Sequence, residues 1–330
     1  MNAMLPIQIL GTGSYLPAEV IRNDHFTSYL DTSDEWIVTR TGIRERRKAP
    51  PSECTSTMAV EASKRALADA GLAVEDIDAI ICATSTGDYP FPPTAALIQA
   101  GLSAPNVPAF DIAAACAGYI YATYVAAGML TAGIYRRVLV VGSESLSRYG
   151  DPEDRRTVVL FGDAAGAAVL ARSADPSRGI LHYEMGCDGT KADWIWVPAG
   201  GAKLYASATT VAERLHYMRM RGREVYKFAV LKMAELIDRA LAAAKITAAD
   251  LKLMVPHQSN LRIIESVRDR LNLPAEKVAV NIDRCGNTSA ASVIMALDEH
   301  RRKGTLQAGD FILLIGIGAG LTWGTMVLRL

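Results

Sequence analysis

In Asp111-Ile-Ala-Ala-Ala-Cys116-Ala-Gly-Tyr-Ile-Tyr-Ala122, a cysteine separates a short apolar run from a long Ala-rich segment. Residues 107–112 predict a buried strand, and the segment that ends at Gly133 predicts a helix. Cys116 then lies at or near the N-terminus of this helix, where free N–H groups and the helix dipole lower a thiol pKa. The pattern therefore predicts a nucleophilic cysteine, although a lone cysteine among apolar residues is more often a small core side chain.

Composition excludes several classes of protein. The 330-residue chain has 35 basic and 35 acidic residues, and this zero net charge gives no field that favours nucleic acid or membrane. Its five scattered cysteines form no C-x-x-C pair, which argues against a disulfide framework or zinc site and favours a reducing compartment. The N-terminus has no signal-peptide pattern, and the uncharged segment 112–135 is too rich in Ala and Gly for a membrane span. We expect a cytoplasmic protein.

The chain also contains an internal similarity. Residues 66–85 align without a gap with residues 240–259, and each segment predicts a helix, a short turn, an acidic residue and a strand. Downstream, the apolar runs that begin at Val107 and Val278 each lead into small residues and a helix. Helix–strand units resemble one another in general, but two successive units in the same order favour a duplication.

The duplication has a geometric consequence. Cys116 and Asn287 occupy nearly the same turn in the two halves, and His257 follows the strand predicted at 251–255. Ligands of α/β sheets bind beyond the carboxyl ends of the strands. If the two sheets are related by a pseudo-twofold axis, these three residues converge on one site.

Cys, His and Asn together suit acyl transfer. A cysteine can carry an acyl group as a thioester, and His and Asn can both donate hydrogen bonds to a developing oxyanion. Gly318 would let the backbone approach such a thioester. Taken singly, His257 is compatible with a core histidine, Asn287 with a helix N-cap and Gly318 with a bulged hairpin.

The remaining pattern predicts an alternation of helices and strands with one irregular excursion from Gly186 to Gly222. Strands are expected at 7–12, 78–84, 138–142, 251–255 and 278–282, as two strands joined by a turn within 158–170, and as two strands around 316–320. Helices are expected at 55–70, 94–100, 224–245, from Asn260 to Leu271 and from Ser289 to Lys303. The basic loop 40–48 suits a phosphate-bearing ligand, with Trp36 available to stack on a flat base.

Several motifs carry a resemblance to a known family: Thr32-Ser-Asp-Glu-Trp-Ile-Val-Thr-Arg-Thr-Gly-Ile43, Ala115-Cys-Ala-Gly118, Phe161-Gly-Asp163, Pro256-His-Gln-Ser-Asn-Leu-Arg-Ile-Ile264, Gly286-Asn-Thr-Ser-Ala-Ala-Ser292 and Thr322-Trp-Gly324. Together they resemble the β-ketoacyl-acyl-carrier-protein synthase III family of the thiolase superfamily. The resemblance implies an α/β, thiolase-like, duplicated αβαβα five-layer fold. We expect an N-terminal half over residues 1–176 with the nucleophilic cysteine and a C-terminal half over residues 177–330 with His and Asn.

The resemblance also implies a decarboxylative Claisen condensation that initiates fatty acid synthesis. Cys116 would take an acyl group from acyl-CoA, and malonyl-acyl-carrier protein (malonyl-ACP) would then bind and lose CO2. His257 and Asn287 would stabilise the resulting enolate, while backbone N–H groups of Cys116 and Gly318 would form the oxyanion hole. Acyl-CoA and malonyl-ACP are substrates in this scheme, so neither a cofactor nor a metal is expected.

Binding residues follow from the same resemblance. Five positions match residues that hold CoA: Thr32, Trp36, Arg40, Arg155 and Asn260. Six positions match the contact with acyl carrier protein: Lys227, Gln258, Ser259, Asn260, Leu261 and Arg262. The basic residues from Arg219 to Lys227 suit an acidic carrier protein, and Phe91 matches a residue that reaches the partner's acyl pocket in a homodimer.

Three other functions stay open at this point. A specialised condensing enzyme of secondary metabolism, such as a quinolone- or polyketide-type starter synthase using another acyl-CoA, shares the same three residues. The family's usual residues are replaced at four positions that bear on donor preference: Ala164, Arg223, Ser259 and Ala319. A papain-like protease would need a secretory, disulfide-bearing context, and a non-catalytic binding protein predicts an unreactive Cys116.

Overall fold

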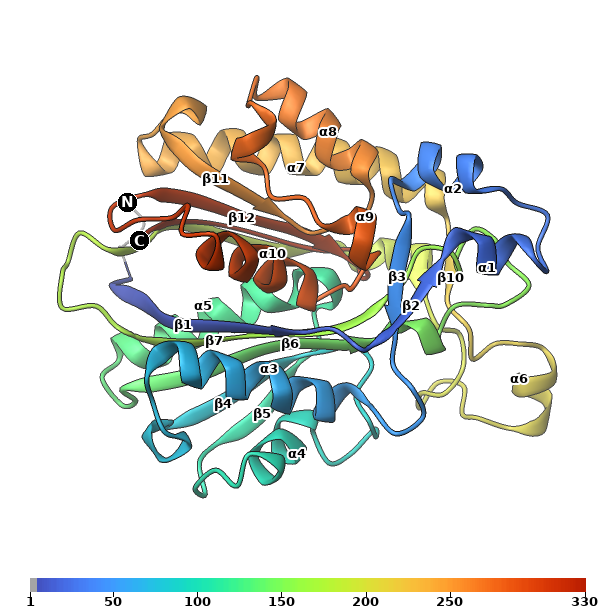
Figure 1. The fold of residues 1–330 in the computed structure, drawn as a ribbon, viewed down its shortest axis with the longest axis horizontal. Helices are drawn as coiled ribbons and strands as arrows, with labels where there is room; N and C mark the ends of the chain where they lie inside the picture. The colour runs from blue at the N-terminus through green and yellow to red at the C-terminus, as the bar shows by residue number, and fades with distance from the viewer. Residues whose placement is uncertain (1–4) are drawn as a thin grey trace.

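Two β-sheets, with helices between them and outside them, form the layers of the computed structural model, which describes residues 5–330 (Figure 1). The first sheet has the order β1 (Ile7–Tyr15), β7 (Asp163–Arg172), β6 (Arg137–Ser145), β4 (Ala79–Ala83), β5 (Ala109–Ile112). The second has the order β11 (Leu251–Pro256), β12 (Phe311–Gly318), β13 (Thr322–Arg329), β8 (Gly179–Cys187). Two short ribbons pair β2 (Glu19–Arg22) with β3 (Glu45–Lys48) and β9 (Ile195–Trp196) with β10 (Arg219–Met220).

Helices cover both faces of each sheet. The outer layers contain α3 (Thr55–Ala70) and α4 (Thr94–Gly101) beside the first sheet, and α7 (Gly222–Ala244) and α8 (Leu261–Arg270) beside the second (Figure 1). The central layer contains α5 (Gly118–Thr131) and α10 (Ala291–Arg302), which contact strands of both sheets. Four shorter helices are α1 (Asn23–Thr27), α2 (Asp34–Thr41), α6 (Ala208–Ala212) and α9 (Ile282–Cys285).

Helix α5 is apolar all round because it lies between two sheets. Ile120, Ala122, Ala126 and Ala127 are fully buried, and their small side chains let the sheets approach closely. This explains the long uncharged segment that the sequence presents. Within the described residues, no helix has the length and apolar character needed to cross a membrane.

The two sheets follow the same topology. In the first sheet β1, β7, β6 and β4 are neighbours in that order, and in the second sheet β8, β13, β12 and β11 are neighbours in that order. Every strand of the first sheet lies within residues 7–172 and every strand of the second within 179–329. This correspondence supports the duplication, and the boundary between residues 176 and 177 stays a prediction.

The strand predicted at 278–282 is wrong. Only Val278 pairs with a strand residue, Met254, and helix α9 begins at Ile282. The Gln258 side chain takes the backbone groups that a strand would need. It donates to the Ala279 carbonyl at 3.0 Å and accepts from the N–H groups of Asn281 and Ile282.

Of the two strands predicted within 158–170, the second is confirmed as part of β7 and the first is wrong, because β7 begins only at Asp163 and is one continuous strand. Residues before it form turns instead, in which the Leu160 N–H donates to the Thr157 carbonyl at 3.0 Å. The small residues of β7 allow α10 to pack closely. A Cβ atom at Gly166 would lie 2.5 Å from Ile294 Cγ2.

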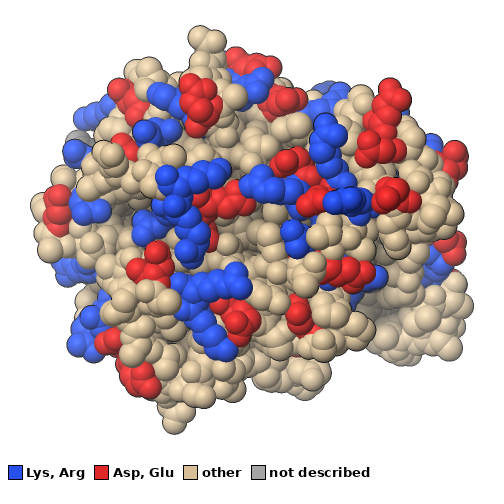
Figure 2. All heavy atoms as spheres, in the orientation of Figure 1, with Lys and Arg blue, Asp and Glu red and all other residues tan. Residues whose placement is uncertain are grey.

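The predicted excursion consists of short elements between β8 and α7. They include β9, α6 and β10, and α6 lies apart from the layered body at one edge of Figure 1. Basic and acidic side chains are interspersed over the face shown in Figure 2, as the zero net charge leads one to expect.

Candidate active site

Cys116 lies in a tight turn between β5 and α5. The turn is a short 3-10 helix, Ala115–Ala117, and Ala115 has a left-handed φ of 47°. A left-handed alanine costs about 1–2 kcal/mol, so the surrounding contacts must hold this turn in place. Strand β12 passes so close that a Cβ atom at Gly318 would lie 2.6 Å from the Cys116 nitrogen. The predicted close approach of the Gly318 backbone is therefore present.

One cavity of about 1240 Å³ brings the three candidate catalytic residues together. Cys116, His257 and Asn287 all line it, although they are far apart in the sequence. Gly316 lies between Cys116 and His257 and allows them to approach closely. A Cβ atom at Gly316 would lie 3.0 Å from the Cys116 carbonyl oxygen and 3.5 Å from His257 Cβ. Convergence at the ends of β5 and β11 agrees with the geometry that the duplication implies.

His257 follows β11 and is held from both sides. Its backbone N–H donates to the Ile315 carbonyl at 2.7 Å, and its Nδ1 atom lies 2.7 Å from Ser292 Oγ. Among the described residues, no group bonds Nε2, which leaves this atom for a ligand. Burial lowers the pKa of the imidazole to about 3, so His257 is neutral near pH 7.

Asn287 is oriented by its neighbours in a similar way. The Ser289 N–H donates to Asn287 Oδ1 at 2.9 Å, so the Nδ2 amide faces away from this bond and has no partner within residues 5–330. The Asn287 backbone bonds Leu160 and Gly162 at 2.8 and 3.1 Å. The cavity thus contains two neutral hydrogen-bond donor groups, if His257 carries its proton on Nε2.

The Cys116 thiol differs from the expectation of a lowered pKa. Its side chain is partly accessible through the cavity, but protein surrounds it. The pKa of the thiol is raised to about 12, chiefly by burial and also by the nearby Glu144, while the Ser289 side chain acts in the opposite direction. The desolvation cost therefore exceeds the effect of the helix N-terminus.

Aromatic and basic side chains line the cavity away from Cys116. The guanidinium carbons of Arg40 and Arg155 lie 4.7 and 4.9 Å from the centre of the Trp36 ring. All three residues line the cavity, as do Asn260, Ser259 and Arg262. The Asn260 side chain also caps α8, accepting from the Arg262 N–H, and donates to the Arg40 carbonyl at 2.9 Å.

Other predicted binding residues lie outside the cavity lining: Thr32, Lys227, Gln258, Leu261, Phe91 and Gly318. The Gln258 side chain is fully buried and bonds the backbone of residues 256–282. The prediction that Gln258 contacts a carrier protein is therefore wrong, because its amide supports the fold. Phe91, by contrast, is 85% exposed.

Comparison with known proteins agrees with this site. A family model described as 3-Oxoacyl-[acyl-carrier-protein (ACP)] synthase III matches residues 110–189, and the C-terminal model of that family matches residues 241–330. The chain is 51% identical, over 97% of both chains, to the Beta-ketoacyl-[acyl-carrier-protein] synthase III of Caldanaerobacter subterraneus subsp. tengcongensis. The chain belongs to the 3-oxoacyl-acyl-carrier-protein synthase III family. It is thus a condensing acyltransferase with the thiolase fold, of the type that initiates fatty acid synthesis.

Solved structures of synthase III proteins share this fold. The crystal structure of 3-oxoacyl-[acyl-carrier-protein] synthase III from Aquifex aeolicus VF5 has a TM-score of 0.90 and 45% identity, covering 98% of this chain and all of that one. The priming β-ketosynthase of the R1128 polyketide biosynthetic pathway has a TM-score of 0.91 and 38% identity, covering 100% and 98%. A synthase III fold therefore occurs in both fatty acid and polyketide settings.

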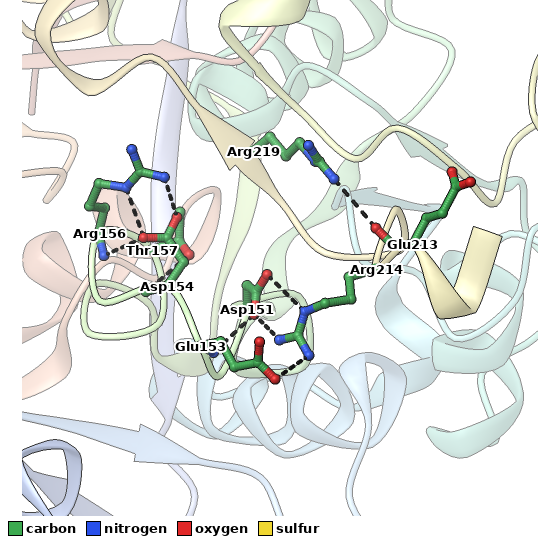
Figure 3. Close-up of polar contacts among 8 residues, drawn as sticks. All are labelled: Asp151, Glu153, Asp154, Arg156, Thr157, Glu213, Arg214 and Arg219. Carbon is green, nitrogen blue, oxygen red and sulfur yellow. Dashed lines mark hydrogen bonds and ion pairs between the residues drawn. The ribbon is translucent and has the colours of Figure 1, made fainter. Parts of the chain in front are cut away.

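Two segments that contribute residues to the cavity are joined by ion pairs. Arg214, in the excursion, bonds the carboxylates of Asp151 and Glu153 (Figure 3). The Met218 N–H also donates to the Tyr149 carbonyl at 2.8 Å. These segments contribute the following cavity-lining residues: Tyr149, Arg155, Arg156, Met218, Met220 and Arg221. The ion pairs thus connect the two segments that supply these lining residues.

Sequence reasoning missed three polar residues around the catalytic groups. Ser289 and Ser292 lie inside a quoted motif, so their spacing from Asn287 was available as a signal. Glu144 lies in β6, two residues after its apolar run ends at Gly142, and carries no such signal. Its position becomes evident only in the folded chain, where it is fully buried.

Proposed function

We propose that Cys116 accepts the acyl group of an acyl-CoA and that His257 and Asn287 stabilise the enolate formed from malonyl-ACP. The observation that carries this proposal is the shared cavity. It contains a cysteine beside two side chains, each with a nitrogen free to donate a hydrogen bond to a ligand. Donors fixed before the reaction stabilise charge that develops in the transition state.

In the first half-reaction, CoA would bind along Trp36, Arg40 and Arg155, with Thr32 and Asn260 nearby. The Trp36 ring, already in contact with the Arg155 guanidinium, offers an aromatic surface for a flat base, and arginines suit phosphate groups. Cys116 Sγ attacks the thioester carbonyl, whose oxygen accepts from backbone N–H groups of Cys116 and Gly318. The bond from the carbonyl carbon to the CoA sulfur then breaks, the thiol proton passes to that sulfur, and CoA would leave as its thiol.

In the second half-reaction, malonyl-ACP loses CO2 and its enolate attacks the Cys116 thioester. The enolate oxygen would accept hydrogen bonds from His257 Nε2 and Asn287 Nδ2. A neutral His257 can donate from Nε2 only when Nδ1 accepts a hydrogen bond. The Ser292 hydroxyl, 2.7 Å from both Nδ1 and the Ser289 carbonyl, would supply that bond when its one hydrogen turns from the carbonyl to Nδ1. The direction of the Ser292 hydroxyl would therefore set the tautomer of His257.

The proposed partners extend beyond the cavity. An acidic carrier protein would contact Lys227, Ser259, Leu261 and Arg262 near the cavity. The neighbouring arginines would add positive charge to this surface. The exposed Phe91 would reach the acyl pocket of a partner in a homodimer. The reaction needs no metal or redox cofactor, and we place the synthase in the cytoplasm.

A specialised starter synthase is the second candidate. Its support is the likeness to the priming β-ketosynthase of a polyketide pathway, with a TM-score of 0.91 and 38% identity. The higher identity of 51% to a relative named as a β-ketoacyl-ACP synthase III supports the first candidate instead. The two candidates share the catalytic residues and differ in the acyl group that Cys116 accepts.

Intact-protein mass spectrometry separates these candidates. The protein is incubated with a panel of acyl-CoAs, with Cys116→Ala as the control, and malonyl-ACP is then added. An acetyl adduct that depends on Cys116 and is discharged by malonyl-ACP supports fatty acid initiation. Adducts formed only with long, branched or aromatic donors support the specialised synthase, and no Cys116-dependent adduct with any donor contradicts the acyl-enzyme mechanism.

A further inference from the structure

Glu144 is a buried carboxylate that the mechanism above does not use. It lies near the end of β6, its side chain is fully buried, and it forms no ion pair with the basic residues of the described chain. A buried charge without a cation is costly unless hydrogen bonds replace its hydration. We therefore ask which hydrogen bonds replace the hydration of the Glu144 carboxylate.

Hydroxyl and amide groups surround this carboxylate. Thr86 Oγ1 donates to it at 2.5 Å, the Ser85 N–H at 3.2 Å, Ser289 Oγ at 3.0 Å and Thr84 Oγ1 at 3.3 Å. Ser289 comes from the opposite half of the chain, so this bond joins the two halves at the active site. Burial raises the pKa of Glu144, while these bonds act in the other direction.

Ser289 is linked to the catalytic residues through different atoms, directly to Asn287 and through Ser292 to His257. Its N–H orients the Asn287 amide at 2.9 Å, and its carbonyl accepts from the hydroxyl of Ser292, which contacts His257 Nδ1. Its own hydroxyl donates to Glu144 at 3.0 Å and lowers the pKa of the Cys116 thiol. Ser289 has a left-handed φ of 44°, so contacts around it must hold this conformation.

We propose that Glu144 is a positioning residue that acts through Ser289 to hold Cys116, His257 and Asn287 in one fixed arrangement. The carboxylate anchors the Ser289 hydroxyl, and the Ser289 backbone then sets the orientation of the two enolate-stabilising side chains. This inference deepens the proposed function, since it rests on the roles given to these three residues.

The arrangement has a measurable electrostatic consequence. The negative charge of Glu144 raises the pKa of the Cys116 thiol, whereas the Ser289 hydroxyl lowers it. Glu144 also raises the pKa of Cys82, in β4, and of Tyr149, in the loop that follows β6. The neutral His257 also lines the cavity that Cys116 faces. Loss of Glu144 and loss of the Ser289 hydroxyl should therefore move the thiol titration in opposite directions.

The test is the pH dependence of Cys116 alkylation by iodoacetamide, followed on the peptide that contains Cys116. Glu144→Gln should lower the pH midpoint, which raises the alkylation rate at a fixed pH below the midpoint. Ser289→Ala should raise the midpoint. This measurement uses no acyl donor, so it does not depend on the substrates proposed above.

Asp163→Asn is the matched control. Asp163 is also buried, lies in the adjacent strand β7, and has its pKa raised by burial, but it bonds Ala49 and Ser147 instead of Ser289. Its midpoint should equal that of the unaltered enzyme. An unchanged midpoint in Glu144→Gln, or an equal shift in Asp163→Asn, overturns the proposal.

A kinetic comparison provides the second readout. Glu144→Gln should lower the condensation rate at least tenfold while the Cys116 acyl-enzyme still forms, because the orientation of His257 and Asn287 is lost. If Glu144→Gln does not fold, Ser289→Ala alone decides: a midpoint that does not rise contradicts the proposed link. Condensation by Glu144→Gln at the rate of the unaltered enzyme contradicts it equally.

Discussion

Replacing Gly318 by alanine places a methyl group 2.6 Å from the Cys116 nitrogen. The same atom would lie 3.0 Å from both Ala115 Cβ and Thr322 Oγ1. These neighbours are backbone or short side chains, so none can swing away. To restore an ordinary contact of 3.4 Å, the Cys116 nitrogen must move by about 0.8 Å.

This displacement acts on the reacting atoms. Misplacement by about 1 Å can cost about a hundredfold in rate, and loss of one oxyanion-hole donor costs a similar factor of about 10²–10³. We therefore expect Gly318→Ala to acylate Cys116 about a hundredfold more slowly than the unaltered protein. Overpacking of this kind should also destabilise the fold by about 1–3 kcal/mol.

The assay follows acyl-CoA consumption and intact mass in a single turnover, with thermal unfolding measured in parallel. Gly128→Ala is the control, because Gly128 is exposed on the helix that follows Cys116 and a Cβ atom there meets nothing within 4 Å. Alanine favours a helix over glycine by about 1 kcal/mol, so this variant should be slightly more stable and fully active. If folded Gly318→Ala acylates Cys116 at a rate within twofold of the unaltered protein, the methyl group does not displace the Cys116 nitrogen as predicted.

Three further predictions follow from contacts in the site. Ser292→Ala should slow condensation about tenfold or more but leave acylation within a few-fold, because only the His257 tautomer depends on that hydroxyl; equal loss in both half-reactions would contradict this role. Trp36→Ala should raise the KM for acyl-CoA about tenfold or more, since stacking is worth about 1–3 kcal/mol per base, and leave kcat nearly unchanged; steady-state kinetics would show whether KM stays constant instead. The pKa of His257 is about 3 in the folded protein and 6.5 in its ordinary state, so below about pH 6.5 the unfolded chain binds the additional proton. The free energy of unfolding should thus fall by up to about 1.4 kcal/mol per pH unit from about pH 6.5 toward pH 3, and urea titrations of His257→Asn should show a shallower fall over this range.

Local sequence patterns predicted secondary structure correctly where the residues of a single segment are enough to determine it. The apolar face and the following Gly71 placed helix α3 at residues 55–70, and Gly71 adopts a φ of 64° at its end. The order of helices and strands in both halves followed from periodicity in the same way. These features depend on neighbours within a few residues, which a pattern in one sequence can represent.

Predictions failed where distant residues replace local pairing. The apolar run from Val278 to Ile282 reads as a strand, but the Gln258 side chain takes its backbone hydrogen bonds. The helix-terminal position of Cys116 suggested a lowered thiol pKa, but burial between the two halves raises it to about 12. In both cases the deciding group comes from a separate part of the chain.

The linear chain was enough to predict the layered α/β architecture, the repeated order of elements and Cys116, His257 and Asn287 as candidate site residues, because periodicity and motif spacing are properties of the linear chain. The orientation and charge of these residues depend on the folded structure. Ser289 and Glu144 come from different halves and meet only when the two sheets pack against the central helices. Hydrogen-bond direction and desolvation depend on that packing, since both act over a few ångströms in space whatever the separation in sequence.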